Sequence, residues 1–242
     1  MIKRPPQAHS LPRARASLLA VLWLGLFIGP CAADNRLTAS EHPAPWQAAI
    51  VKINVPVTRW VDGRQKHINE ECSGTLVQGR QPLILTAWHC FDGYRDLSKP
   101  PRFLWRGQWR QLRLLSHGGS MQADWALLEI PELKLENAVI LPVLLKENTS
   151  NASLLLAGYS RDTGLGQGGN ELTFEQDCLL LSTGDAWHST RCTAFKGASG
   201  GPVLSVFQGQ HYVVGIISAR DEAGITLFTP VNLIASAAGL QQ

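Results

Sequence analysis

The chain has 242 residues, of which 45% are hydrophobic and 17% are charged. This composition excludes a disordered or fibrous protein and suits a globular chain that buries a core in one large domain or two small ones. The formal net charge of +3 comes from the N-terminal segment, so the rest of the chain gives no reason to expect a nucleic-acid partner.

Residues 1–33 have the layout of a secretory signal peptide. Four basic residues precede an apolar stretch, residues 18–28, and small residues follow it. We expect cleavage after Ala33, a mature chain that starts at Asp34, and a periplasmic or secreted protein with no stable membrane insertion. One alternative is an uncleaved membrane anchor, for which the apolar run is short. The other is a lipid anchor on Cys31, which the preceding proline disfavours.

Removal of this segment changes the charge and the cysteine count. The segment holds four of the 22 Lys and Arg and none of the 19 Asp and Glu, so the remaining chain has a net charge of −1. An even number of cysteines in an exported protein predicts two disulfides. A zinc site is the alternative, but the spacing is not that of metal ligands, and we expect no metal and no cofactor. The four remaining cysteines are Cys72, Cys90, Cys178 and Cys192.

Short β-like runs recur along the chain with turn signals between them, which predicts an all-β barrel or sandwich. Only the tail has a helical pattern, which starts at Pro230 and stops at Gly239. The polar segment 146–151 is the predicted seam between two barrels. The β-like runs cover residues 48–55, 74–77, 83–86, 112–115, 125–130, 153–158, 178–181, 202–206, 212–218 and 226–228.

Three local patterns carry residues that belong to one kind of chemistry. His89 follows an apolar strand, Asp124 stands at the mouth of another, and Ser199 lies in the glycine-flanked turn 197–201. Each pattern alone is compatible with a structural role. A serine hydroxyl becomes a good nucleophile when a neutral imidazole accepts its proton and a buried carboxylate holds that imidazole in one tautomer. Together the three residues therefore predict a catalytic triad.

In these motifs and their order, the sequence resembles the chymotrypsin and trypsin family of serine proteases, from Pro45-Trp46 through the C-terminal helix. The resemblance implies an all-β fold of two six-stranded antiparallel β-barrels with a C-terminal helix. Residues 34–242 would form the protease domain, with barrel one at about 44–145 and barrel two at about 152–242. It also implies a monomeric endopeptidase that hydrolyses protein or peptide substrates through an acyl-enzyme intermediate.

The resemblance further implies roles for residues around Ser199. The backbone N–H groups of Gly197 and Ser199 would form the oxyanion hole. Thr193 stands where trypsin-like enzymes keep an aspartate, which argues against a preference for Lys or Arg. Arg220 either pairs with an acidic substrate side chain or points to solvent, and both readings stay open. Ser218 would in addition form a hydrogen bond near Asp124. The implied substrate-binding positions are Thr193, Ser218, Arg220 and Thr226.

The cysteines and the residue before Ser199 indicate a branch of this family. The resemblance implies a disulfide between Cys72 and Cys90, which leaves Cys178 to pair with Cys192. Ala198 replaces the aspartate that pairs with a new N-terminus in members activated by a cut. This pattern is closest to the bacterial glutamyl endopeptidases, although Ile217 stands where those enzymes carry a histidine.

A binding protein without catalysis and an esterase are the two alternatives to a protease. Some members of this fold have lost catalysis and act as binding proteins, usually with a replaced triad residue. An esterase would carry the Gly-x-Ser-x-Gly motif and alternating helices of an α/β-hydrolase, which this sequence lacks. We therefore expect a serine endopeptidase.

Overall fold

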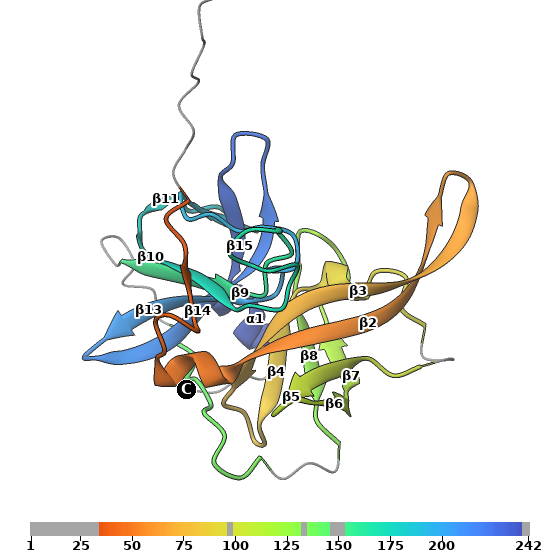
Figure 1. Ribbon diagram of the computed structural model, residues 1–242, viewed down its shortest axis with the longest axis horizontal. Coiled ribbons are helices and arrows are strands. Elements are labelled where there is room, and N and C mark those ends of the chain that lie inside the picture. Colours follow the sequence, from red (N-terminus) through yellow and green to blue (C-terminus); the bar gives the residue numbers. More distant parts are fainter. Residues whose placement is uncertain (1–33, 96–98, 132–134, 146–152, 239–242) are drawn as a thin grey trace, which may run out of the picture. The chain divides into compact units, whose positions relative to one another are not determined.

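Two antiparallel β-sheets account for almost all of the regular structure (Figure 1). The computed structural model describes residues 34–95, 99–131, 135–145 and 153–238. The predicted signal peptide, the predicted seam at 146–151 and the predicted helix stop at Gly239 lie outside the described residues. In the described part of the chain, no helix is long and apolar enough to cross a membrane.

The first sheet has seven strands in the order β6-β5-β2-β3-β4-β8-β7. A short 3₁₀ helix, η1 (Pro45–Ala49), leads into it, and a second, η2 (Trp88–Phe91), follows β4. The strands are β2 (Ile50–Val61), β3 (Arg64–Val77), β4 (Leu83–Thr86), β5 (Arg102–Trp105), β6 (Gln108–Gln111), β7 (Arg113–His117) and β8 (Ala126–Glu129).

The second sheet has eight strands in the order β1-β10-β9-β13-β14-β15-β12-β11. The helix α1 (Val231–Ala238) follows its strand β15 directly, because Pro230 ends the strand and suits a helix start. The strands are β1 (Leu37–Thr38), β9 (Leu154–Gly158), β10 (Thr173–Cys178), β11 (Leu180–Ser182), β12 (His188–Thr190), β13 (Pro202–Phe207), β14 (Gln210–Arg220) and β15 (Thr226–Pro230).

The β2–β3 hairpin is the longest element of the first sheet and projects from it in Figure 1. Val61 pairs with Arg64 across a two-residue turn, in which Asp62 and Gly63 have φ values of 52° and 72°. Asp-Gly is favoured in such turns because both central residues need positive φ. The inner half of the hairpin is buried, whereas Trp60 near the tip is 71% exposed.

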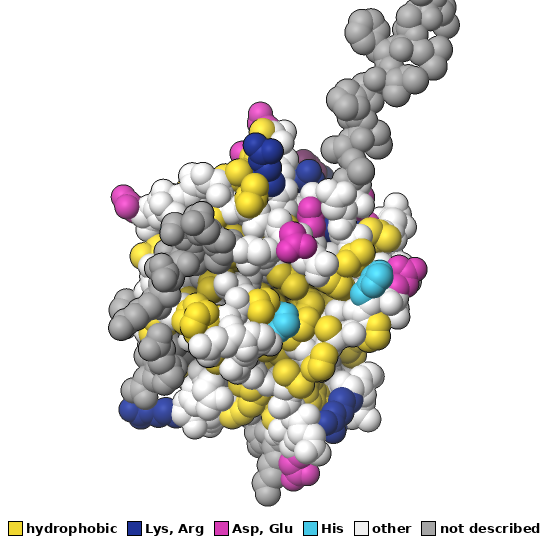
Figure 2. All heavy atoms as spheres, turned by 90° about the vertical axis from the view of Figure 1, so that its left-hand side faces the viewer, with side chains coloured by type: hydrophobic (Ala, Val, Ile, Leu, Met, Phe, Trp, Pro, Cys, Tyr) yellow, Lys and Arg dark blue, Asp and Glu magenta, His cyan; other side chains and the backbone are white. Residues whose placement is uncertain are grey.

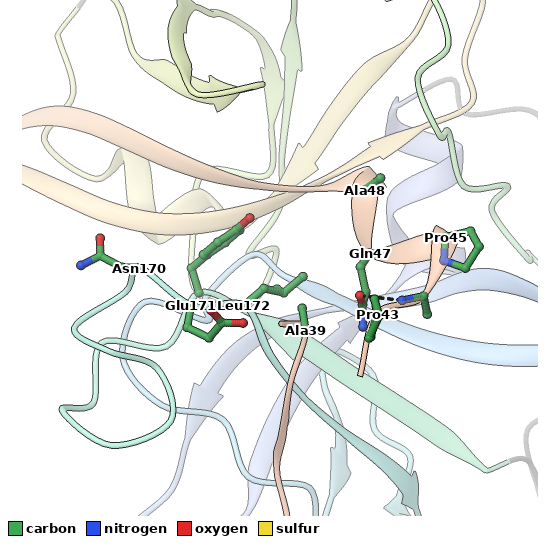
Figure 3. A pocket seen from close by; sticks show the side chains of 10 residues that line it. Ala39, Pro43, Pro45, Gln47, Ala48, Asn170, Glu171 and Leu172 are labelled. Atoms are coloured by element: carbon green, nitrogen blue, oxygen red, sulfur yellow. Dashed lines mark hydrogen bonds between the residues drawn. The ribbon is translucent and has the colours of Figure 1, made fainter. Parts of the chain in front are cut away.

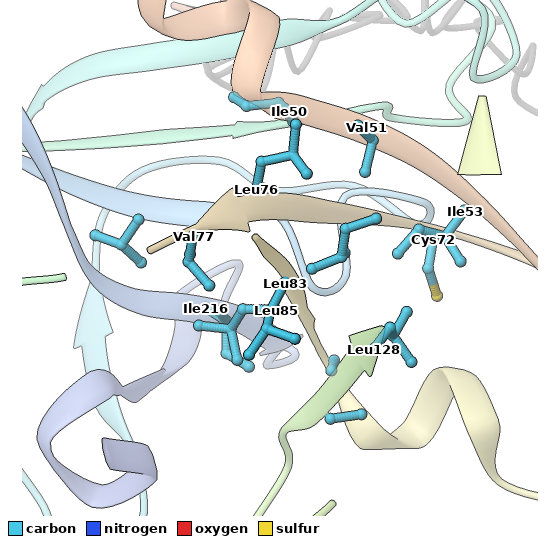
Figure 4. Close-up of a cluster of buried hydrophobic side chains, with 14 of the residues drawn as sticks. Ile50, Val51, Ile53, Cys72, Leu76, Val77, Leu83, Leu85, Leu128 and Ile216 are labelled. Atoms are coloured by element: carbon cyan, nitrogen blue, oxygen red, sulfur yellow. The ribbon is translucent and has the colours of Figure 1, made fainter. Parts of the chain in front are cut away.

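The main core lies on the inner face of the first sheet and includes side chains of the second (Figure 4). Ile50 on β2, Leu76 on β3, Leu85 on β4 and Leu128 on β8 are joined there by Ile216 of β14. All five are at most 4% exposed. Burial of each such side chain stabilises the fold by about 1.5–3 kcal/mol before entropy costs, so this core holds the two sheets together.

One face of the protein carries hydrophobic side chains across its middle, with charged side chains mostly toward its margin (Figure 2). Elsewhere along the described chain, large apolar side chains are also exposed, mainly near the ends of strands. The residues with more than half of their surface accessible are Trp60, Leu115, Leu179, Val206 and Phe207.

The structure confirms the predicted all-β fold with a C-terminal helix, and it corrects the expected number of strands. The sheets have seven and eight strands rather than six each. The additional strands are short or polar: β6 is exposed along its whole length, and β1 has two residues. Such segments lack the apolar alternation by which a strand is recognised. The strands without a counterpart among the predicted runs are β1, β5, β6, β10 and β12.

Candidate active site

The structure brings His89 and Asp124 into direct contact. Asp124 is fully buried just before β8, and its Oδ2 lies 2.8 Å from Nδ1 of His89. Its Oδ1 accepts the backbone N–H of His89 at 2.8 Å. A carboxylate only accepts hydrogen bonds, so the proton of the neutral imidazole sits on Nδ1 and leaves the lone pair of Nε2 free to accept one.

A third donor completes the surroundings of the Asp124 carboxylate. The Ser218 hydroxyl, on β14, donates to Oδ2 of Asp124. In addition, the hydroxyl of Thr229 on β15 donates to the backbone carbonyl of Asp124 at 3.5 Å. Residues of the second sheet thus fix a carboxylate that belongs to the first, because a buried charge is stable only when its oxygens are hydrogen-bonded.

His89 itself is held by the disulfide beside it. Cys90 is bonded to Cys72 with an S–S distance of 2.02 Å, which ties η2 to strand β3. The guanidinium of Arg59 on β2 donates to the carbonyl of His89 at 3.0 Å. The His89 side chain is 25% exposed, so its imidazole is anchored on one side and accessible to solvent on the other.

The turn that carries Ser199 is anchored at its backbone. The carbonyl of Ser199 accepts the N–H of Ser73 at 2.8 Å, and the N–H of Gly200 donates to Ile217 at 2.8 Å. The Ser73 hydroxyl donates to the carbonyl of Gly197 at 2.8 Å and accepts the N–H of Tyr159 at 2.8 Å. Strands β3 and β14 therefore hold the turn from two sides.

Gly200 brings this turn against the segment that leads to His89. Its φ is +77°, a conformation that L side chains rarely adopt. A Cβ atom at this position would lie 2.1 Å from Oγ1 of Thr86 and 2.7 Å from the backbone nitrogen of Ala87. Only glycine allows this approach, which places Ser199 beside the end of β4 from which η2 and His89 follow.

The N–H groups of the turn fall into two sets. Ala198 donates to the carbonyl of Phe195 at 3.0 Å and Gly200 to that of Ile217. The N–H groups of Gly197 and Ser199 donate to no residue in the described part of the chain. Gly197 has a φ of +97°, which requires glycine. These two N–H groups are thus free of partners within the described part of the chain.

Two of the expected substrate-binding residues shape the segment before Ser199. Thr226 is fully buried; its hydroxyl donates to the carbonyl of Cys192 at 2.5 Å and accepts the N–H of Ala194 at 3.2 Å. The N–H of Thr193 donates to Oε2 of Glu175 at 2.6 Å. A small cavity behind this segment is lined by Thr193, Ala194, Ala198 and Ile217, among others.

Comparison with known proteins identifies the family. Residues 72–216 match the model of the trypsin-like peptidase domain. The chain belongs to the trypsin-like peptidase family. No curated protein matches it significantly.

Solved structures of proteases share the fold of this trypsin-like peptidase. Protease Anisep from Arthrobacter nicotinovorans matches with 17% identity and a TM-score of 0.61, over 81% of this chain and 93% of that one. The active form of the Rv3671c protease from M. tuberculosis matches with 18% identity and a TM-score of 0.59, over 97% and 96%. The chymotrypsin-like fold is therefore shown.

The side chains of Arg220 and Ser218 of the peptidase are both engaged by other groups of the protein. Arg220 is exposed, and its Nε donates to the carbonyl of Gly224 at 3.2 Å. Its Cζ lies 5.3 Å from the centroid of the Phe195 ring. The guanidinium is thus held against its own hairpin and Phe195, while the Ser218 hydroxyl is taken up by Asp124.

A charged cluster that the sequence does not predict lies close to the Ser199 turn. Arg36 is 5% exposed and forms ion pairs with Asp34 at 2.6 Å and with Asp162 at 2.8 Å. Burial by itself would lower the pKa of Arg36, but the hydrogen bonds to both carboxylates raise it above its ordinary value. The hydrogen bonds from Arg36 in turn lower the pKa of Asp34 and of Asp162. No local pattern marks these residues, because Arg36 and Asp162 are 126 positions apart.

The described residues hold one group with metal-ligand spacing, formed by Cys72, His89 and Cys90. Both cysteine sulfurs of this group are joined in a disulfide, so neither is a thiolate that binds a metal. Cys178 and Cys192 are also paired. The disulfides replace the zinc site that the sequence left as an alternative.

A larger cavity of about 550 Å³ is lined by none of His89, Asp124 and Ser199 (Figure 3). It is a hollow between the N-terminal segment, with Ala39 and Pro43, and the residues before β10, with Asn170 and Glu171. Burial, together with the charge of Glu171, raises the pKa of Tyr159 in its wall. None of the predicted site residues lines this cavity.

Proposed function

We propose that the protein is an exported serine-type endopeptidase that uses Ser199, His89 and Asp124 as its triad. The observation that carries the proposal is the buried Asp124 carboxylate, which accepts both the backbone N–H and the Nδ1–H of His89. This arrangement aims the free Nε2 of His89 outward as a general base. Membership of the peptidase family supports the same reaction.

In the proposed reaction, the hydroxyl oxygen of Ser199 attacks the scissile carbonyl carbon and its proton passes to Nε2 of His89. The carbonyl oxygen becomes an oxyanion, which accepts hydrogen bonds from the N–H groups of Gly197 and Ser199. The C–N bond then breaks, and the leaving amine takes the proton from His89. Water attacks the resulting acyl-enzyme with His89 again as the base, and the acid product leaves.

We further propose that the peptidase needs no cut that creates a specific N-terminus and acts as a monomer. Ala198 is buried and uncharged, so it offers no partner to a new α-amino group. This feature supports a place near the glutamyl endopeptidase branch. The preference of that branch for glutamate before the scissile bond is not carried over. Ile217 lines the small cavity behind the segment before Ser199, and the Glu175 carboxylate accepts the backbone N–H of Thr193 there. We propose a small or medium uncharged residue before the scissile bond.

The proposal is tested with purified mature protein, a peptide library and a fluorophosphonate probe. Wild-type protein should cleave peptides and take up the probe at Ser199, whereas Ser199→Ala and His89→Ala should lose about 10⁴-fold or more in kcat. The matched control is Ser205→Ala, a buried serine of β13 outside the site, which should react like the wild type.

Three results would redirect the proposal. A wild type that folds, resists the probe and cleaves no peptide would indicate a binding protein instead of a peptidase. Hydrolysis of a triglyceride but not of casein would indicate an esterase. Labelling of the Ser199→Ala variant at the wild-type rate would show that another residue is the nucleophile.

A further inference from the structure

The N-terminal strand places one buried arginine next to the Ser199 turn. Strand β1 pairs with β10, with Leu37 opposite Phe174, and this pairing brings the preceding residue, Arg36, into the second sheet. The Arg36 side chain is 2% exposed. Its Nη1 also lies 3.4 Å from the hydroxyl of Thr173. A guanidinium removed from water in this way is held by its two carboxylates, so its position is well defined.

Arg36 contacts the Ser199 turn through an aromatic ring. Its Cζ lies 4.1 Å from the centroid of Phe195, four residues before Ser199. The Phe195 carbonyl accepts the N–H of Ala198, the bond that closes the turn. A guanidinium over an aromatic face is attracted to it, most strongly where water is excluded. Movement of the Phe195 ring would therefore be passed to the peptide groups next to Ser199.

A second connection runs through the residue that pairs with Arg36. Asp162 accepts from Arg36, and its neighbour Arg161 donates its N–H to the carbonyl of Lys196 at 2.6 Å. Lys196 directly precedes Gly197. A Cβ atom at Gly197 would lie 2.5 Å from the carbonyl oxygen of Tyr159, so this stretch packs tightly on the turn. Arg36 thus supports the turn both at Phe195 and at Lys196.

Among the described residues of the turn, 195–201, no charged side chain is buried, since Lys196 is exposed. The side chain before Ser199 is that of Ala198, and a Cβ atom on Gly158 would lie 2.8 Å from Cβ of Ala198. On the outer side, the Phe195 ring faces Arg220, whose Cζ is 5.3 Å from its centroid. Arg36 therefore supplies a buried charge to this turn from outside it.

We propose that Arg36 is a positioning residue for the proposed peptidase, which holds Phe195 and the Gly197–Ser199 peptides in the arrangement that binds the oxyanion. The inference rests on the proposed function and adds one requirement to it. Full catalytic activity requires the Arg36 side chain, near the start of the folded domain, and does not require a free α-amino group.

The first test compares Arg36→Ala with wild type and with Arg113→Ala. Arg113 is a matched control because it also forms an ion pair, with Glu129, but its side chain is 67% exposed and lies in the first sheet. Active sites are counted by titration with the fluorophosphonate probe, and kcat and KM are then measured on the best peptide substrate. We expect Arg36→Ala to lower kcat per active site by about tenfold to a hundredfold with KM changed less than about threefold, because misaligned oxyanion donors affect mainly the transition state. Arg113→Ala should match the wild type.

The second test keeps the inference testable if Arg36→Ala does not fold. Phe195→Leu retains an apolar side chain but removes the aromatic face, and it should lower kcat in the same way. In the double variant, the loss should be smaller than the product of the two single losses, since both remove one interaction. Arg36→Lys keeps the charge without the planar guanidinium and should fall between Arg36→Ala and wild type. Residues added before Asp34 should leave kcat unchanged.

The outcomes separate the inference from the proposed function. If wild type cleaves peptides and Arg36→Ala has the wild-type kcat per active site, the inference is wrong and the peptidase assignment stands. The same holds if the kcat loss of the double variant equals the product of the losses of Arg36→Ala and Phe195→Leu. It also holds if Arg36→Ala lowers only the unfolding temperature. If wild-type protein itself neither cleaves nor reacts with the probe, the proposed function fails first.

Discussion

Gly200 shows how much of the site depends on a single residue without a side chain. Gly200→Ala should prevent the close approach of the Ser199 turn to β4, because the added Cβ would lie 2.1 Å from Thr86 Oγ1 and 2.5 Å from the carbonyl oxygen of Ser73. We expect a loss of several-fold or more in activity and a destabilisation of about 2–4 kcal/mol, part from the positive φ and part from the clash. Urea unfolding and peptide hydrolysis measure the two effects.

Gly209 provides the control for this substitution. Its φ of +78° is almost that of Gly200, but a Cβ there would have nothing within 4 Å. Gly209→Ala should therefore cost only the strain of the backbone, about 1–2 kcal/mol, with unchanged kcat. Equal losses at the two glycines would show that the contact with β4 is unimportant.

Arg220 tests whether charge is read near the substrate. Its guanidinium is engaged by the Gly224 carbonyl and the Phe195 ring. We therefore expect Arg220→Gly to lower cleavage after acidic and after small apolar residues by the same factor, within about twofold, in a competition assay on paired peptides. A selective loss of cleavage after Glu or Asp would instead show that Arg220 pairs with an acidic substrate side chain.

At the scale of elements, the disulfide between β3 and η2 positions His89. The bridge from Cys72 to Cys90 spans 18 residues, so replacing both cysteines by Ala should lower the free energy of unfolding by about 3 kcal/mol. We also expect a lower kcat, because η2 carries His89 next to Cys90. Chemical denaturation and kinetics on the Cys72→Ala/Cys90→Ala variant measure both.

The other disulfide is a suitable comparison. Cys178 and Cys192 are 14 residues apart, so their loop-closure contribution is similar. Cys178 ends β10 and Cys192 follows β12, so neither adjoins His89 in the chain. Their removal should reduce stability to a similar extent with less effect on kcat. If both pairs changed only stability, the first disulfide would have no part in placing His89.

At the scale of the whole molecule, Arg36 makes the stability of the fold depend on pH. The pKa of Asp34 and that of Asp162 are lowered by its hydrogen bonds, so folding favours the charged form of both carboxyls. A carboxyl with a folded pKa below its unfolded value of about 4 stabilises the fold above that pH, and this stabilisation is lost as the pH falls through the folded pKa.

We accordingly expect Asp162→Asn to reduce the free energy of unfolding at pH 7 and to make its decline between about pH 5 and pH 2 less steep. Urea denaturation at several pH values measures the difference from wild type. Glu136→Gln is the control, because this substitution removes one carboxylate at an exposed position. Parallel pH curves for Asp162→Asn and wild type would show that the ion pair contributes nothing to acid sensitivity.

The sequence alone determined the features that local pattern encodes. The apolar run Leu83–Thr86 is strand β4 as predicted, and Pro230 does end a strand at the start of the C-terminal helix. His89, Asp124 and Ser199 are predicted as a triad because the residues around each are contiguous and their chemistry is complementary. The Asp62-Gly63 turn carries an equally local signal, since Asp-Gly favours the positive φ values that a two-residue hairpin turn needs.

Only the tertiary structure decided which distant groups support that site. Arg36 meets Asp162 and Phe195 because β1 pairs with β10, and the two residues of β1 are too few to show any periodicity. Likewise, the hydroxyl that donates to the backbone carbonyl of Asp124 belongs to Thr229, which lies 105 positions later in the chain. A local pattern records which face of a strand is buried, whereas such contacts arise from how the sheets pack, and no stretch of sequence contains both partners.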